Sequence, residues 1–181
     1  ETRDFEIASC RLFAPACTVD FATKTYGRAL EKQVFPAENF YLHALSDTLE
    51  RADRVGPYGK SLLYLISRAL EVNHKEPILG LHWLHEPDHP DCPADFWHVP
   101  TSRRRPGKDR FNPDVRYWQD SVAPFIPKQN IEINEARFVS DGKNQIRQTH
   151  GSFDNQVHLI NRVIEQIRQK PADPLVERLV Y

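Results

Sequence analysis

Two short apolar runs, each followed by a segment with helical periodicity, constrain the fold most. The first run covers residues 5–14 and precedes a stripe of apolar residues at helical spacing from Val19 to Lys32. The second covers residues 39–45 and precedes residues 58–71, which are apolar over more than half of a helix circumference. Strands that alternate with helices in this way are typical of a parallel sheet with crossover helices. The sequence therefore predicts an α/β fold with three layers, in which a mostly parallel sheet lies between flanking helices.

A further strand and helix are predicted near the end of the chain, with a single histidine between them. Residues 131–139 alternate as a half-buried strand does, and apolar residues recur at helical spacing from 157 to 167. Ser152 or Asp154 is the expected N-cap of this helix. His150 falls in the connecting loop. Because loops on a rigid scaffold often carry function, His150 is a candidate catalytic base. The alternative is a solvated or capping histidine.

The segment from about 82 to 128 is rich in proline and aromatic residues, unlike the rest of the chain. A segment with this much apolar surface does not remain solvated, so we expect a functional excursion or a cover over a site. We treat it as an insertion within a single domain of residues 1–181. Residues 77–82 fit either a further short strand or the approach to this insertion.

Charge and composition exclude several classes of partner. The net charge is −1 and the pI is about 6.8, so no overall field favours nucleic acid or an anionic membrane. The dense basic run Arg103–Arg105 is predicted to be a solvated loop. The sequence has no signal peptide and no apolar run of membrane-spanning length. Three cysteines at scattered spacing favour a reducing compartment, and we expect a cytoplasmic protein.

Asp47 and His150 form the first candidate site. Loops at the carboxyl ends of parallel strands meet at one rim of the sheet, so an aspartate after one strand and a histidine after a later one can come together there. The carboxylate would orient the imidazole and stabilise its protonated form while the histidine transfers a proton. Asp53 is a second candidate for the acid, and Asp47 is preferred because it directly follows the strand. The alternative role of Asp47 is a helix N-cap.

Several segments carry a resemblance to a known fold. They are Leu12–Thr18, Ala44–Asp47, Lys60–Glu71, Ile78–Gly80 and His150–Asp154. Together they resemble the C-terminal half of a poorly characterised bacterial group of α/β-hydrolase-like proteins. The resemblance implies hydrolysis of an ester, thioester or amide in a small acyl substrate, with Asp47 and His150 as acid and base of a Ser-His-Asp triad.

The sequence departs from that family in one respect, because it contains no Gly-x-Ser-x-Gly motif. It begins at Glu1 and has no methionine, so we expect a piece of a larger product, with the serine in a missing N-terminal half or in a partner chain. The other interpretation is a non-catalytic interaction or scaffold protein that retains the hydrolase-like sheet.

A second candidate site is a metal centre formed by His82, His85, His89 and Cys92. Imidazole and thiolate ligands suit zinc, and His98, Asp88, Asp91 and Asp95 are near in sequence. The intervening prolines prevent one continuous helix from presenting the ligands. The alternative is a loop whose polar residues are solvated or paired while its aromatic residues anchor it to the core.

A third candidate lies at residues 56–61, where Gly59, Lys60 and Ser61 are similar to the end of a phosphate-binding loop. Arg54 stands where the first glycine of that motif is needed, and the preceding strand ends too early. We therefore expect Gly59 to ease the entry into a buried helix and assign no nucleotide to this segment.

Overall fold

A small parallel sheet lies at the centre of the molecule. The computed structural model describes residues 7–54, 59, 61–71, 75–100, 109–141 and 144–171. Strands β1 (Cys10–Phe13), β2 (Phe40–Leu45) and β5 (Ile131–Asn134) form this sheet in the order β1-β2-β5. β2 pairs in parallel with both neighbours, and its Leu42 lies opposite Leu12 on one side and Ile131 on the other. The predicted α/β class with a parallel sheet is confirmed at this level.

One face of the sheet is covered by the first helical segment. α1 (Val19–Ala22), a π-helical turn (Thr23–Gly27) and α2 (Arg28–Glu31) follow one another without a break, as predicted for residues 19–32. The Thr18 hydroxyl caps this segment by accepting a hydrogen bond from the Phe21 amide at 3.2 Å. Phe40, Leu42 and Ala44 alternate along β2 and belong to the main apolar cluster with Val19, Ala22 and Leu30.

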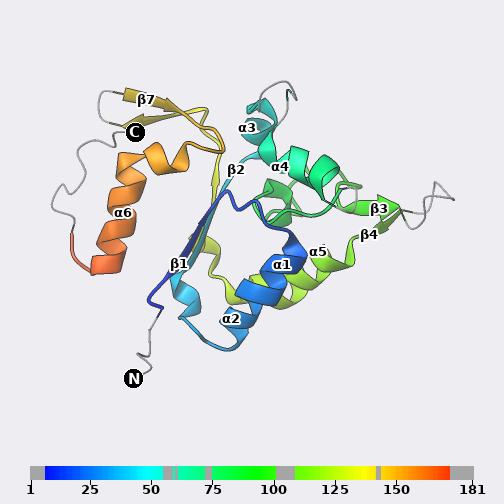
Figure 1. Cartoon of the computed structure of the whole chain (residues 1–181), viewed down its shortest axis with the longest axis horizontal. Helices are drawn as coiled ribbons and strands as arrows, with labels where there is room; N and C mark the ends of the chain where they lie inside the picture. The colour runs from blue at the N-terminus through cyan, green and yellow to red at the C-terminus, as the bar shows by residue number, and fades with distance from the viewer. Residues whose placement is uncertain are drawn as a thin grey trace.

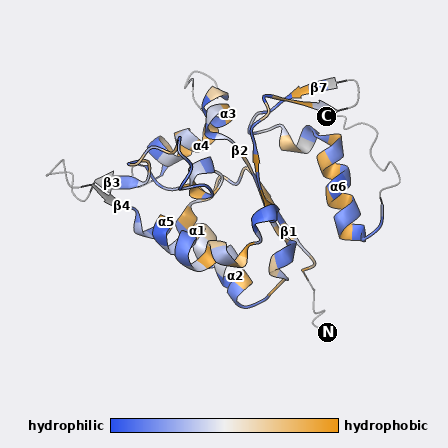
Figure 2. Cartoon of the chain, turned by 180° about the vertical axis from the view of Figure 1, so that it is seen from behind, coloured by the Kyte–Doolittle hydropathy of each residue, from blue (hydrophilic) through white to orange (hydrophobic). Residues whose placement is uncertain are grey.

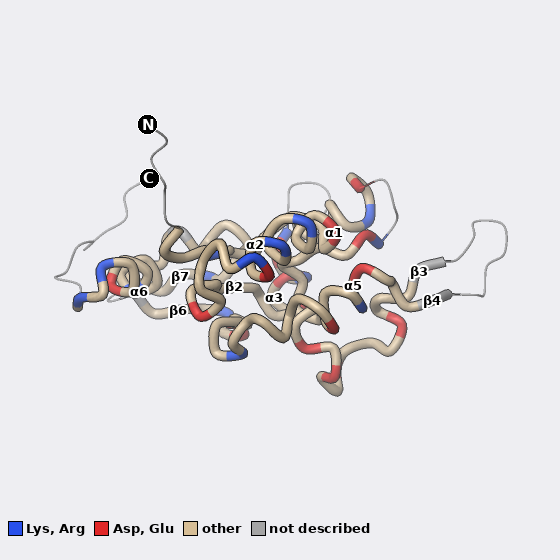
Figure 3. The backbone as a smooth tube through the Cα atoms, turned by 90° about the horizontal axis from the view of Figure 1, so that it is seen from below, with Lys and Arg blue, Asp and Glu red and all other residues tan. Residues whose placement is uncertain are grey.

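The other face is covered by α6 (Val157–Arg168), so helices lie on both sides of the sheet (Figure 1). Here Leu45 belongs to a smaller cluster with Ala14, Leu49, Phe153 and Leu159. Figure 2 shows polar and apolar residues interspersed around α6. Its polar residues also contact the sheet, because Arg162 pairs with Glu132 at 2.8 Å and Gln166 accepts a hydrogen bond from Arg11. Acidic and basic residues are spread along the tube in Figure 3, in keeping with the balanced composition.

Two short helices follow the carboxyl end of β2. α3 (Asp47–Ala52) begins after Ser46, whose hydroxyl accepts a hydrogen bond from the Leu49 amide at 3.4 Å. α4 (Leu62–Leu65) continues into a π-helical turn (Ile66–Leu70) and starts at Ser61, which caps it in the same way. The predicted helix over 58–71 is therefore shorter at its start. Gly59 has a φ of +66°, a conformation that glycine adopts readily, while residues 55–58 and Lys60 lie outside the described residues.

Gly80 marks the closest approach between the chain after α4 and the chain after β1. A Cβ atom at this position would lie 2.8 Å from the Pro15 carbonyl oxygen and 2.9 Å from the Ala14 carbonyl carbon. The Gly80 amide also donates to the Pro15 carbonyl at 2.9 Å, so the backbones cannot separate without losing this bond.

We expect Gly80→Ala to destabilise the fold by about 2 kcal/mol, because overpacking against backbone leaves no side chain free to move. Urea denaturation measures the change. The matched control is Gly151→Ala, since an added Cβ there meets no described atom within 4 Å. Equal stability of the two variants would contradict the close approach at Gly80.

The insertion contributes to the core and contains regular elements. It has a 3-10 turn (His82–Leu84), strands β3 (His98–Pro100) and β4 (Asp109–Phe111), α5 (Pro113–Tyr117), a π-helical turn (Trp118–Val122) and two further 3-10 turns (Ala123–Phe125 and Lys128–Asn130). Trp83, Trp97 and Trp118 are buried in the main cluster. The predicted anchoring of this segment by aromatic residues is confirmed. Arg103–Arg105 lie outside the described residues.

The strand predicted over 131–139 is wrong in its extent. β5 ends at Asn134, and the chain then forms an antiparallel pair of β6 (Phe138–Asp141) and β7 (Asn144–Arg147). The Ser46 amide donates to the Asn134 carbonyl at 2.9 Å, and α3 begins immediately after Ser46. β2 therefore offers no further partner, and residues 135–137 are exposed.

The predicted N-cap of the last helix is also wrong. Ser152 bonds back to Thr149 through two contacts of 2.9 Å, and a 3-10 turn (Phe153–Asn155) intervenes before α6. Gln156 occupies the N-cap position without a capping bond from its side chain to the described residues. The side chain of Asp154 lies outside the described residues. None of the helices in the described part of the chain is both long and apolar enough to cross a membrane.

Candidate functional site

His150 lies beside α3, the helix that follows the carboxyl end of β2. Its backbone amide donates a hydrogen bond of 2.8 Å to Asp53 Oδ2, just past the end of α3. Leu49 of α3 and Phe153 of the following turn belong to the same apolar cluster, which holds the two segments together. The prediction that a loop near the last helix returns His150 to the rim of the sheet therefore agrees with the structure.

The imidazole of His150 faces a buried carboxylate that the sequence did not identify. His150 Nδ1 and Glu50 Oε1 are 4.0 Å apart. The Glu50 side chain is 2% exposed and that of His150 is 19% exposed. This distance is too long for a hydrogen bond but close enough for strong electrostatic coupling away from water. Neither His150 Nδ1 nor either Glu50 oxygen has a hydrogen bond of standard geometry to the described residues.

Burial sets the protonation of both groups. It raises the pKa of Glu50 to about 7, and the nearby Asp53 and Asp47 act in the same direction. The Ser61 hydroxyl and the Leu63 amide lie near enough to oppose this increase but do not cancel it. Burial lowers the pKa of His150, and the charge of Asp53 offsets this only in part. At neutral pH the imidazole is therefore uncharged, which is the form that accepts a proton.

Asp47, the preferred acid in the sequence, has other partners. One of its oxygens accepts a hydrogen bond from the Tyr64 hydroxyl, and the other pairs with Arg51 Nε at 2.8 Å. Asp47 is the first residue of α3, and Ser46 serves as the N-cap in its place. Within the described part of the chain, no contact joins Asp47 to His150. Asp53 reaches only the backbone of His150, so Glu50 is the carboxylate nearest to its ring in function.

No sequence signal separates Glu50 from its neighbours. It lies between Asp47 and Asp53 on a six-residue helix, and a glutamate at this position reads as an ordinary exposed helical residue. Its burial arises because the 148–153 segment and the start of α4 both pack against α3.

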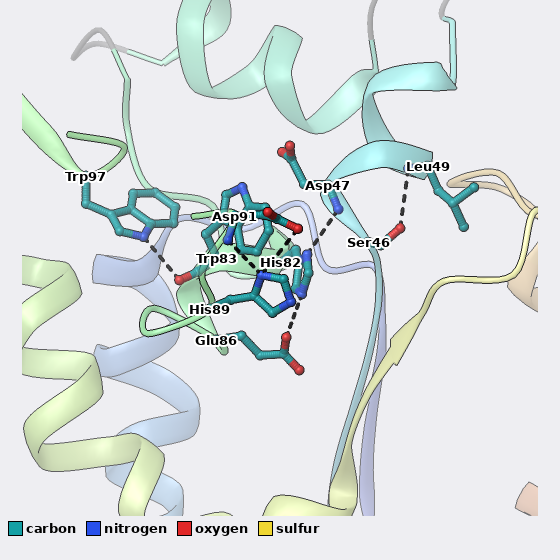
Figure 4. Close-up of polar contacts among 9 residues, drawn as sticks. All are labelled: Ser46, Asp47, Leu49, His82, Trp83, Glu86, His89, Asp91 and Trp97. Carbon is teal, nitrogen blue, oxygen red and sulfur yellow. Dashed lines mark hydrogen bonds and ion pairs between the residues drawn. The ribbon is translucent and has the colours of Figure 1, made fainter. Parts of the chain in front are cut away.

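His82 of the proposed metal centre has a different role. The Asp47 amide donates to His82 Nδ1 at 3.2 Å, so Nδ1 carries no proton, and Nε2 donates to Glu86 Oε2 at 2.9 Å (Figure 4). The ring also stacks on Trp83 with centroids 4.1 Å apart. Both nitrogens are thus occupied, and His82 holds the start of α3 against the insertion.

The other predicted zinc ligands also have protein partners. His85 Nε2 is bonded to the Leu79 carbonyl at 2.8 Å, and desolvation lowers its pKa to about 4. His89 Nδ1 accepts from the Asp91 amide at 3.1 Å, and Cys92 Sγ points to the Pro93 carbonyl. In the ranges that the structure describes, no group of three or more His, Cys, Asp or Glu residues is arranged to hold a metal ion. The geometry therefore favours the paired loop over the metal centre.

Comparison with known proteins yields no relative. No protein-family model, no curated protein and no solved structure matches this chain. The assignment of a function consequently depends on the residues themselves.

Proposed function

We propose that His150 is the general base of an α/β-hydrolase-like enzyme that cleaves an ester, thioester or amide. Glu50 takes the place of Asp47 as the acid that orients it. The observation that carries this proposal is the buried Glu50 carboxylate beside Nδ1 of a partly buried, uncharged imidazole. A proton on Nδ1 facing Glu50 leaves Nε2 as the proton acceptor.

In the proposed reaction a serine hydroxyl attacks the acyl carbon while His150 Nε2 removes its proton. The imidazolium then returns the proton to the leaving group, and water releases the acyl group in the same manner. Glu50, as a carboxylate, stabilises the imidazolium. Because its pKa is raised to about 7, the pair readily shares one proton near neutral pH. The serine comes from another segment or a partner chain, since these 181 residues contain no Gly-x-Ser-x-Gly motif.

The sheet supports the idea of an additional segment. β1 and β5 are the edge strands of the described sheet, and each presents a row of backbone groups to one side. Pairing with further strands would extend the parallel sheet, as in a complete α/β hydrolase. The same edges suit the alternative of a non-catalytic scaffold, and the serine distinguishes the two.

The test uses the protein purified from its natural source with whatever chains accompany it. Native mass spectrometry lists the chains, a fluorophosphonate probe labels an activated serine, and a panel of p-nitrophenyl esters reports turnover. We expect labelling, and we expect His150→Ala to lower kcat by about a thousandfold or more. His158→Ala, an exposed histidine on α6, should leave kcat unchanged.

The pH profile gives a second readout. Since the pKa of His150 is lowered, kcat/KM should hold below pH 6.5 and fall only as the imidazole becomes protonated at more acidic pH. Ester turnover that survives His150→Ala would refute the proposed role of His150. Absence of serine labelling in an otherwise intact assembly would favour the scaffold.

A further inference from the structure

A second cavity lies between α3 and α4 and is independent of His150. Its volume is about 290 Å³, which is the lower end of the size range for small-molecule sites. Its described lining consists of Arg51, Gly59, Tyr64 and Arg68. Two of these four residues carry a permanent positive charge, and none of them carries a carboxylate. The cavity therefore has the charge that suits an anion.

The Arg51 side chain is held in place by its neighbours. Its Nε pairs with Asp47 Oδ2 at 2.8 Å, and the other oxygen of Asp47 accepts from the Tyr64 hydroxyl. The guanidinium carbon of Arg51 also lies 5.4 Å from the centroid of the Tyr64 ring. A guanidinium has five N–H donors, so the contact through Nε leaves donors for a ligand. Asp47 thus orients Arg51 without using all of its hydrogen-bonding capacity.

Arg68 is placed by the same tyrosine. It lies one helical turn after Tyr64, and its guanidinium carbon is also 5.4 Å from the ring centroid. Tyr64 is itself buried and fixed through Asp47. One aromatic ring therefore serves as a common support for two guanidinium groups, each of which is planar and matches the oxygens of a carboxylate or phosphate.

Gly59 forms the remaining part of the wall. A Cβ atom at Gly59 would meet no described atom within 4 Å, so this side of the cavity is open. A ligand can therefore enter beside the start of α4 and reach both arginines.

We propose that this cavity binds the oxyanion group of a small molecule, a carboxylate or a phosphate, through Arg51 and Arg68. Asp47 and Tyr64 act as positioning residues for the two guanidinium groups. The site does not require the hydrolase reaction, and its test measures binding alone.

Isothermal titration calorimetry with inorganic phosphate and, separately, with acetate tests this site in low-salt HEPES buffer. We expect saturable binding of at least one anion. Arg51→Gln and Arg68→Gln should each weaken it about tenfold, as the loss of a charge-assisted hydrogen bond does. Arg51→Lys should be intermediate, because it keeps the charge but loses the fork. Added sodium chloride should weaken binding by screening.

Lys24→Gln is the matched control, since Lys24 is an exposed cation paired with Asp20 on the far helix α1. It should bind like the parent protein. Arg68→Gln guards against a folding artefact, because it removes a guanidinium without leaving Asp47 unpaired. Binding of only one anion identifies the ligand class and supports the site. Failure of both anions to bind, or undiminished binding in both glutamine variants, would overturn it.

Discussion

Glu50→Gln is expected to stabilise the fold above neutral pH and to abolish the proposed hydrolase activity. Burial raises the pKa of Glu50 from its usual 4.5 to about 7. One pKa unit corresponds to about 1.4 kcal/mol, so ionised Glu50 costs the folded state up to about 3 kcal/mol. Glutamine has nearly the same shape and never ionises, so the variant avoids this cost.

The sign follows from the direction of the shift. Below pH 4.5 Glu50 is protonated in both the folded and the unfolded chain, and the substitution should change stability little. Between pH 4.5 and 7 the unfolded chain ionises first, so the parent protein loses stability as pH rises. Above pH 7 the loss is complete, and the variant should be the more stable protein by the full amount.

Urea denaturation at pH 4.5 and pH 8 measures this difference. Glu135→Gln, an exposed carboxylate beyond β5, is the control and should show no such dependence on pH. Ester turnover is measured on the same samples. A variant that is more stable and inactive would identify Glu50 as a group retained for function. A stability difference that is the same at both pH values would show that Glu50 is not buried as an acid.

Trp118→Ala is expected to be the most destabilising single substitution in the insertion, at about 3–5 kcal/mol. Trp118 is fully buried in the main apolar cluster and begins the π-helical turn that follows α5. Truncation to alanine would leave a large cavity beneath the helices that cover the sheet.

Two neighbouring changes separate burial from other effects. Tyr117→Ala removes an aromatic residue that is 56% exposed and should cost much less. Trp118→Phe should also cost less, because the indole N–H has no hydrogen-bond partner in the described residues and its loss frees a buried donor. Thermal denaturation of the three variants ranks them. Equal melting temperatures for Trp118→Ala and Tyr117→Ala would place the insertion outside the core.

The parts of the fold that follow from local pattern were predictable. The helix from Val19 and the strand ending at Leu45 were found because apolar spacing and the Thr18 cap are properties of adjacent residues. The division of residues 131–141 into two strands was not, because alternation persists through both. What ends β5 is the departure of β2 into α3, which is a fact about a partner distant in the chain.

The candidate site was predicted in part for the same reason. The sequence placed His150 at the rim of the sheet, and the structure brings it to α3. The acid was chosen by its position after the strand, which favoured Asp47, whereas burial selects Glu50 one turn later. Burial of a charged residue depends on which surfaces cover it. The His82 to Cys92 cluster shows the converse, since residues close in sequence point to separate partners.

The two helical layers are attached to the sheet by different means. One layer joins a continuous apolar cluster, whereas α6 is held through Leu159, Phe153 and polar links such as Arg162 to Glu132. Half-exposed ion pairs of this kind contribute about 0–1 kcal/mol. The α6 layer therefore opens at a lower free energy than the whole domain. His150 lies in the loop that enters this layer, so local opening separates the base from Glu50 while the remaining core stays folded.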